Sequence, residues 1–217
     1  MKKGKIIVIE GACDGIGKST QYNLLKEKLG DKVITHHFPT YNSYQGKGVE
    51  EYLDGKYGNK EELSQYFINN LYANDRVITW QTELKEKYYE GYTILLDRYT
   101  TSSIIYQSCM IEDIEERKEF IDFVMDYEYN KLGIGKPDTV IFLTAPFDEV
   151  TKLRNSRKTN DGIINDIHEK DPLFMKKVYD NATFIADYLK WDKIECFDGK
   201  KFKEIDEIHN EICKVIK

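Results

Sequence analysis

The sequence has 217 residues and a formal net charge of -6; hydrophobic residues make up 41% of it and charged residues 32%. This length fits one α/β domain, and the apolar fraction is large enough to fill its core. A mildly acidic chain is not expected to hold a nucleic-acid backbone, because that requires an excess of Lys and Arg. We therefore expect no nucleic-acid partner, and a local basic site for any polyanionic ligand.

The ends and the cysteines of the chain favour a cytoplasmic protein without membrane contact. The apolar run near the N-terminus is too short for a signal peptide or a membrane span. The cysteines lack metal-ligand spacing and are interpreted as reduced thiols. Since no repeat or linker interrupts the sequence, we expect one domain over residues 1–217.

Apolar runs alternate with segments of helical periodicity along the chain. In order, we expect a strand at 5–10, a helix at 18–29, a strand at 32–38, a helix at 61–90, a strand at 92–97, a helix at 111–132, a strand at 138–145, helices at 147–158 and 173–189, a strand at 193–197 and a helix at 202–216. This alternation predicts a five-stranded parallel sheet with helices on both faces. Ligands of such sheets lie beyond the carboxyl ends of the strands.

The segment after the first expected strand is rich in small residues and opens a helix. Backbone N–H groups of such a loop point at phosphate oxygens, and the helix N-terminus adds a partial positive charge. Lys18 is expected to reach the β- and γ-phosphates of ATP, and the Ser19 hydroxyl to bind Mg²⁺. The predicted ATP-binding set is Cys13, Asp14, Gly15, Ile16, Gly17, Lys18, Ser19 and Thr20.

This phosphate loop departs from the usual spacing of four residues between its first glycine and Gly-Lys. Counting back from Gly17 places Ala12 at the first position, whereas counting from Gly11 leaves five residues between. Cys13 lies inside the loop, where a helix N-terminus can lower the pKa of a thiol. An inert small residue is the preferred interpretation of Cys13.

The third expected strand ends in Asp97-Arg98-Tyr99. A carboxylate there can hold Mg²⁺ directly or through water. The adjacent Arg98 can bind a phosphate through two parallel hydrogen bonds. Because these residues share a sheet edge with the phosphate loop, a functional role is favoured over a local ion pair.

At these motifs the sequence resembles the thymidylate kinase family of P-loop nucleoside-monophosphate kinases, over nearly the whole chain. The resemblance rests on Glu10-Gly11, residues 14–21 (DGIGKSTQ), Phe38-Pro39, Gly46, Tyr52-Leu53, residues 71–76, residues 97–107 (DRYTTSSIIYQ), residues 136–138, Arg154 and Arg157. It implies a P-loop NTPase-type three-layer fold, a lid at about residues 151–165 and a homodimer. The implied reaction is phosphoryl transfer from Mg-ATP to dTMP, giving dTDP and ADP.

The resemblance also implies substrate contacts. Asp14 resembles the carboxylate that contacts the 3′-hydroxyl, and Arg98 the arginine that clamps the acceptor phosphate. Tyr72 falls where the family has an aromatic ring that stacks on thymine, and Arg76 where it has an arginine that hydrogen-bonds to the edge of the base. For Tyr72, packing as an ordinary aromatic residue of the core is an equally favoured interpretation. The remaining members of the implied substrate-binding set are Phe38, Pro39, Ser103, Tyr106 and Gln107.

The polar segment at residues 151–165 contains Arg154 and Arg157. Most charged runs are solvated helix faces, but an arginine positioned over the transferring phosphate stabilises its charge. The phosphate loop has no arginine, since Gly15 and Ile16 occupy the positions where one branch of the family carries it. The resemblance then implies that the lid arginines, Arg154 and Arg157, take this role, with no choice made between them. The predicted catalytic set is Lys18, Arg98, Arg154 and Arg157.

The segment after Pro39 lacks an arginine that many family members use to hold the acceptor phosphate; it reads Thr40-Tyr41-Asn42-Ser43-Tyr44. A nucleoside acceptor would not need that arginine, and Lys47 can substitute for it. Three alternatives therefore stay open: another nucleotide or deoxynucleoside kinase, a nucleotide-binding protein with a degenerate site, and a P-loop ATPase. The ATPase is the weakest, because it leaves the acceptor-site residues unexplained.

Overall fold

Strands and helices alternate along the chain in the computed structural model, which describes residues 3–58, 62–161 and 172–216, and only the backbone of residues 156–161. The strands are β1 (Ile6–Gly11), β2 (Val33–His37), β3 (Thr93–Asp97), β4 (Thr139–Thr144) and β5 (Asp192–Glu195). The helices are α1 (Lys18–Leu29), α2 (Lys47–Leu53), α3 (Gln65–Thr79), α4 (Lys85–Tyr89), α5 (Thr100–Ser108), α6 (Ile114–Met125), α7 (Phe147–Asp161), α8 (Pro172–Tyr188) and α9 (Ile205–Val215). Among the described residues, no helix is long and apolar enough to span a membrane.

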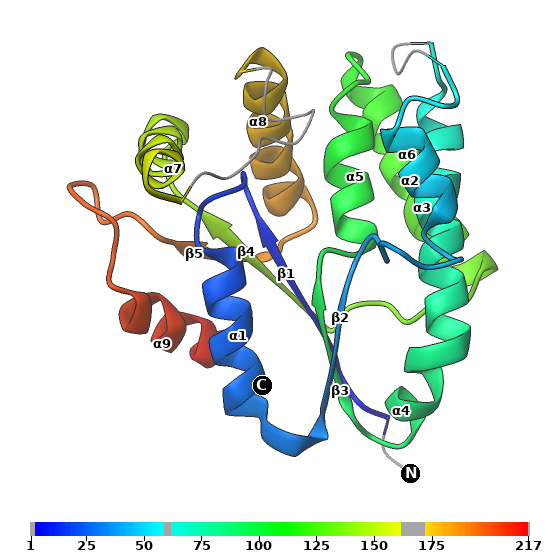
Figure 1. Cartoon of the computed structure of the whole chain (residues 1–217), viewed down its shortest axis with the longest axis horizontal. Coiled ribbons are helices and arrows are strands. Elements are labelled where there is room, and N and C mark those ends of the chain that lie inside the picture. The colour runs from blue at the N-terminus through cyan, green and yellow to red at the C-terminus, as the bar shows by residue number, and fades with distance from the viewer. Residues whose placement is uncertain (1–2, 59–61, 162–171, 217) are drawn as a thin grey trace. The chain divides into compact units, whose positions relative to one another are not determined.

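The strands form one five-stranded sheet in the order β2-β3-β1-β4-β5 (Figure 1). β2 pairs with β3 in parallel, so that His37 lies opposite Asp97 at their carboxyl ends. β4 pairs with β5 in parallel, from Ile141 opposite Asp192 to Thr144 opposite Glu195. The inner strands are nearly continuous runs of buried Ile, Leu and Val, as a sheet covered on both faces requires.

The chain divides into two compact units, and β1 contributes to both. Unit 1 contains Met1–Val8 and Leu29–Asp138, and unit 2 contains Ile9–Lys28 and Thr139–Lys217. In unit 1, α3 packs beside α2 and α5, and α5 beside α6 (Figure 1). In unit 2, α9 packs on β4 and β5. The side-chain amide of Gln21 in α1 donates to the carbonyl of Ile205 at the start of α9, with 2.9 Å between N and O.

Two expected helical stretches are interrupted by wider π-helical turns. The stretch at residues 61–90 consists of α3, a π-helical segment Trp80–Leu84 and α4. The stretch at residues 111–132 consists of α6 and a π-helical segment Asp126–Lys131. The short α2 was not expected as a helix. The division into two units leaves the expectation of a single domain a prediction.

Candidate active site

The phosphate loop lies in unit 2 between β1 and α1. Gly15 has a φ of +91° and Gly17 a φ of +102°, a backbone conformation that L side chains rarely adopt. A Cβ atom on Gly11 would lie 2.9 Å from Cγ2 of Ile16, so the loop closes tightly only with glycine there. The N–H of Ala12 donates to the carbonyl of Leu143 at 3.0 Å and fixes the loop to β4. The strand–loop–helix context that a phosphate loop requires is therefore present.

Side chains of the predicted ATP-binding set divide into buried and accessible ones. Cys13 and Ile16 are buried, so only their backbone groups can face a nucleotide. Asp14 and Lys18 are partly exposed, and Ser19 is exposed in the first turn of α1. The groups of the loop that remain accessible to a nucleotide therefore include Lys18 and Ser19.

Burial makes Cys13 a poor nucleophile. Burial, with a smaller contribution from Asp14, raises the pKa of the Cys13 thiol to about 12. A thiol is reactive as the thiolate, and raising its pKa keeps it protonated at neutral pH. This direction favours the interpretation of Cys13 as an inert small residue.

We expect Cys13 to react with iodoacetamide at pH 8 roughly three orders of magnitude more slowly than a thiol of ordinary pKa, because so little of it is ionised. Peptide mass spectrometry of labelled protein measures this rate, with the more accessible Cys213 as internal reference. Equal labelling of the two cysteines, with ATP blocking only Cys13, would contradict the expectation and indicate a reactive thiol in the loop.

Helix α7, which contains the first part of the expected lid, approaches the phosphate loop at Arg154. A Cβ atom on Gly15 would lie 3.3 Å from Cβ of Arg154, so the glycine allows this close approach. The Nε atom of Arg154 is buried and has no hydrogen-bond partner among the described residues. Arg154 is thus the lid arginine that the structure places at the loop. The side chain of Arg157, and residues 162–165 of the expected lid, lie outside what the structure describes.

Asp97 and Arg98 lie at the carboxyl end of β3 in unit 1. The carboxylate of Asp97 is 3.1 Å from Nδ1 of His37. Arg98 has a φ of +65°, which costs a residue with a side chain roughly 1–2 kcal/mol. Its guanidinium carbon lies 5.3 Å from the centre of the Tyr106 ring. The β3–α5 turn therefore holds Arg98 in a strained backbone conformation, against the aromatic face of Tyr106.

Five of the substrate-binding residues implied by the resemblance lie on α3 and α5, which pack on each other. Tyr72 and Arg76 are one turn apart in α3, and the guanidinium of Arg76 donates from Nη2 to Oγ of Ser103 in α5 at 2.8 Å. The ring of Tyr72 contacts Tyr52 edge-on, with 6.4 Å between centres. Burial, with smaller contributions from Tyr52 and Tyr41, raises the pKa of Tyr72 and keeps its hydroxyl neutral.

Arg76 is almost completely buried and forms an ion pair that the sequence analysis did not anticipate. Its partner is Glu128, whose two carboxylate oxygens accept from Nε and Nη2 of Arg76 at 2.6 and 2.7 Å. Burial by itself lowers the pKa of Arg76, but the carboxylate outweighs it and raises that pKa above its ordinary value. The contact of Arg76 with the edge of the base stays a prediction, whereas its ion pair with Glu128 is defined by the structure.

Two buried side-chain amides, one in α3 and one in α5, have polar atoms without a hydrogen-bond partner among the described residues. Gln107 was predicted as a substrate-binding residue, and Asn69 was not. Oε1 of Gln107 is buried without a hydrogen-bond partner among the described residues, as are both amide atoms of Asn69. Asn69 lies one turn before Tyr72. Buried polar atoms without partners are uncommon and often contact an ordered water or a ligand. No sequence pattern identifies Asn69, because asparagine within a helical stretch is usually exposed.

The segment after Pro39 is held by α3 and by its own backbone. The N–H of Thr40 donates to Oδ2 of Asp75 at 2.7 Å, and the hydroxyl of Ser43 donates to the carbonyl of Thr40. Phe38 is buried and packs 5.7 Å from Tyr99, centre to centre. These contacts make Phe38 a core residue that positions the loop, and its place in the substrate-binding set stays a prediction.

Lys47, which can replace the absent arginine, is bound locally. Its ammonium lies 3.6 Å from Oε2 of Glu50, and its side chain is 59% exposed. An exposed pair of this kind contributes little and is readily broken. The pairing with Glu50 therefore does not prevent Lys47 from binding an acceptor phosphate, and its substitution for the absent arginine stays a prediction.

Ser19 and Asp97, the two predicted magnesium ligands, carry oxygen donors that suit this ion. Mg²⁺ is commonly bound through one or two protein oxygens, several waters and the phosphates of a nucleotide. A cage of protein side chains is not required, and the described residues contain no group of three or more His, Cys, Asp or Glu that could form one. Each residue by itself therefore suits a metal that arrives with its nucleotide, and the magnesium role of both stays a prediction.

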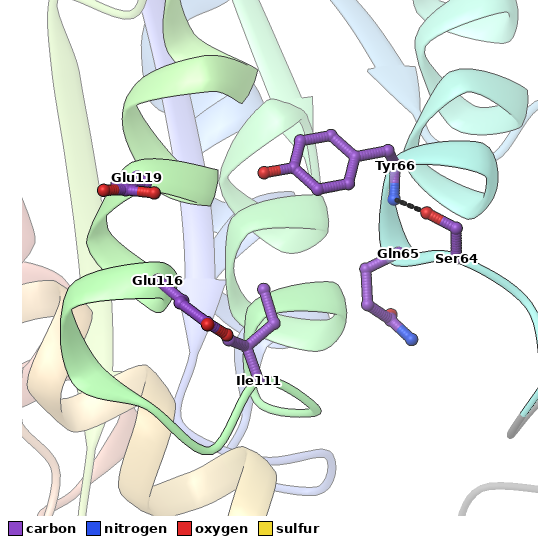
Figure 2. A pocket seen from close by; sticks show the side chains of 6 residues that line it. All are labelled: Ser64, Gln65, Tyr66, Ile111, Glu116 and Glu119. Atoms are coloured by element: carbon purple, nitrogen blue, oxygen red, sulfur yellow. Dashed lines mark hydrogen bonds between the residues drawn. The ribbon is translucent and has the colours of Figure 1, made fainter.

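A shallow pocket of about 380 Å³ lies elsewhere in unit 1, between the start of α3 and α6 (Figure 2). The N–H of Tyr66 donates to Oγ of Ser64 at its rim, with 3.3 Å between the two atoms. Its described lining includes Glu116 and Glu119 and no cationic side chain. Because two carboxylates repel a phosphate, this pocket does not suit a nucleotide.

Comparisons with known proteins identify the family. A family model described as thymidylate kinase matches residues 9–212. The chain belongs to the thymidylate kinase family. It is 33% identical over 217 residues to a "Probable thymidylate kinase" of Methanocaldococcus jannaschii, covering 100% of this chain and 98% of the relative.

Solved thymidylate kinases share the fold. The Candida albicans thymidylate kinase superposes with a TM-score of 0.74 at 27% identity, over 99% of this chain and 91% of that one. The Ehrlichia chaffeensis thymidylate kinase gives a TM-score of 0.65 at 19% identity, with both chains fully covered, and supports the fold alone. The predicted family and the P-loop NTPase-type fold are thus confirmed.

Proposed function

We propose that this protein transfers the terminal phosphoryl group of Mg-ATP to dTMP, giving dTDP and ADP. The observation that carries the proposal is the presence of two cationic groups at strand ends in a chain of this family. Lys18 begins α1 after the phosphate loop of unit 2, and Arg98 follows β3 in unit 1. We assign the triphosphate to the loop that contains Lys18, and the acceptor phosphate to Arg98.

On the donor side, the loop backbone and Lys18 bind the β- and γ-phosphates. Arg154, close to Gly15, supplies the guanidinium group that the loop itself lacks. Ser19 and Asp97 are the residues that would hold magnesium, which neutralises charge on the phosphates when bound. Charge neutralisation and orientation account for most catalysis of phosphoryl transfer.

On the acceptor side, Arg98 binds the phosphate of dTMP, and Tyr72 and Arg76 bind its base. Asp14 is assigned to the 3′-hydroxyl. The acceptor phosphate is already a nucleophilic dianion near pH 7, so no general base is assigned. Stacking of a base on an aromatic ring such as that of Tyr72 contributes about 1–3 kcal/mol.

A deoxynucleoside kinase is the second candidate. The loop after Pro39 is closed by the hydrogen bonds of Thr40 and Ser43 and contains no cation, and Lys47 pairs with Glu50. An acceptor without a 5′-phosphate would not need a second cation there. The solved Candida albicans enzyme is titled as having broad substrate specificity, which makes acceptor profiling informative.

The oligomeric state, the compartment and the class of ligand are proposed from the family and the composition of the chain. We infer a homodimer in the cytoplasm that acts on small nucleotides and not on nucleic acid. The four free cysteines agree with a reducing compartment. Size-exclusion chromatography with light scattering measures the oligomeric state.

A coupled assay of ADP release tests the proposed reaction. Mg-ATP is combined with dTMP, dUMP, thymidine, other nucleoside monophosphates and a control without acceptor. Saturable turnover that prefers dTMP supports the proposal. Turnover with thymidine alone assigns the protein to the deoxynucleoside kinases. ATP binding without turnover of any acceptor indicates a degenerate site.

A further inference from the structure

The carboxylate of Glu128 is completely buried although the sequence around it is polar. Glu128 lies in the π-helical segment Asp126–Lys131 that continues α6. Three hydrogen bonds reach its carboxylate: two from Arg76, and one from the hydroxyl of Thr100 at 3.0 Å. The side chain therefore links α3 and α5 through one buried negative charge, inside unit 1.

Glu128 accepts hydrogen bonds from two specific donors of the Arg76 guanidinium group. The Nε donor and one Nη2 donor bind Glu128, and the other Nη2 donor binds Ser103. The contact of Nη1 with the carbonyl of Tyr99 is 3.5 Å long, at the limit of a hydrogen bond. Of the five donors of an arginine, one on Nη1 thus remains for a ligand.

Arg76 lies four residues after Tyr72 in α3, the residue on which the base is proposed to stack. Residues four apart on a helix lie on the same face, so a base stacked on Tyr72 presents its edge to Arg76. Arginine donates hydrogen bonds and accepts none. A 4-keto oxygen, as in thymine or uracil, can accept from Nη1, whereas the 4-amino group of cytosine leaves two donors facing each other.

Stability alone does not account for the buried pair of Arg76 and Glu128. Replacing such a pair by apolar residues of similar volume is often neutral or stabilising, because both charges lose their hydration on burial. The pair does fix the plane of the guanidinium, since two parallel hydrogen bonds leave it no free rotation. A fixed donor discriminates between base edges more sharply than a mobile one.

We propose that Glu128 is a positioning residue for acceptor choice: it holds Arg76 so that only Nη1 faces the base, which favours a 4-keto over a 4-amino pyrimidine nucleotide. The inference rests on the proposed function, because it requires a base at Tyr72. It adds to that function a residue that touches neither substrate nor nucleotide.

The test compares dTMP with dCMP in unaltered enzyme and in Glu128→Gln. The amide keeps the shape but can no longer accept from both Nε and Nη2 of Arg76. We expect KM for dTMP to rise about tenfold with kcat within about twofold, and the kcat/KM ratio of dTMP over dCMP to fall at least about tenfold. Glu128→Asp keeps the charge, shortens the side chain and is expected to fall between; it carries the test if the glutamine variant does not fold.

Asp126→Asn is the matched control, because it makes the same carboxylate-to-amide change in the same π-helical segment at an exposed position. Its dTMP over dCMP ratio is expected to stay that of the unaltered enzyme. A lower melting temperature with an unchanged ratio in folded Glu128 variants overturns the inference and leaves a structural ion pair. Failure of the unaltered enzyme to use dTMP instead overturns the proposed function, and the base preference with it.

Discussion

Replacing Lys18 by alanine is expected to lower kcat for phosphoryl transfer by at least roughly a hundred- to a thousandfold. Lys18 is the first residue of α1, directly after the left-handed Gly17, so its ammonium and the helix N-terminus act on the same anion. Removing one preorganised positive group from a transition state that spreads negative charge over several oxygens has effects of this size. Rapid-quench or coupled ADP assays at saturating dTMP measure the loss.

Lys26→Ala is the control for Lys18, because it removes the same charge from an exposed position in the last turn of the same helix. Its kcat is expected to match that of the unaltered enzyme. Equal melting temperatures of the two variants exclude unfolding as the cause. An unchanged kcat in the Lys18 variant would show that the loop after β1 does not bind the transferred phosphate.

Replacing Arg98 is expected to separate stability from activity. With alanine, the acceptor loses a charged hydrogen bond worth roughly 1.5–3 kcal/mol, so KM for dTMP rises about ten- to a hundredfold and kcat falls as well. With glycine the kinetic loss is the same, but the φ of +65° is no longer strained, and the free energy of unfolding rises by about 1 kcal/mol. Steady-state kinetics and urea unfolding measure the two effects.

Lys190→Gly serves as the matched backbone control for Arg98→Gly. Lys190 has a φ of +56° and an exposed side chain. It is expected to gain similar stability and to keep full activity. If Arg98→Gly kept the kinetics of the unaltered enzyme, the acceptor-phosphate role of Arg98 would be wrong.

Elements with strong local patterns were predictable from the sequence. α1 runs from Lys18 to Leu29 as expected, because the glycine-rich loop precedes it and Gly30 follows in a left-handed conformation. The inner strands were predictable because each is a short, nearly continuous apolar run. α2 was missed because its seven residues carry only two buried side chains, Val49 and Tyr52, too few for a periodic pattern.

The parts of the site that depend on distant contacts were not predictable. Glu128 lies in a run of polar residues, and its burial follows from the positions of Arg76 and Thr100 in other helices. The contact of Arg154 with Gly15 likewise joins segments separated by more than a hundred residues. The roles of Tyr72, Arg76 and Asp14 came from the family resemblance and stay predictions until they are measured.

Because of the π-helical turn at Asp126–Lys131, deleting a residue in this segment is expected to harm the enzyme more than substituting an exposed one. A π-helical turn contains an extra residue relative to an α-helical turn. Deleting one residue ahead of Glu128 would restore α-helical phase and rotate its side chain by roughly 100° about the helix axis, away from Arg76. Single-residue deletions here should therefore disable the kinase even where every substitution at an exposed site in the segment is accepted.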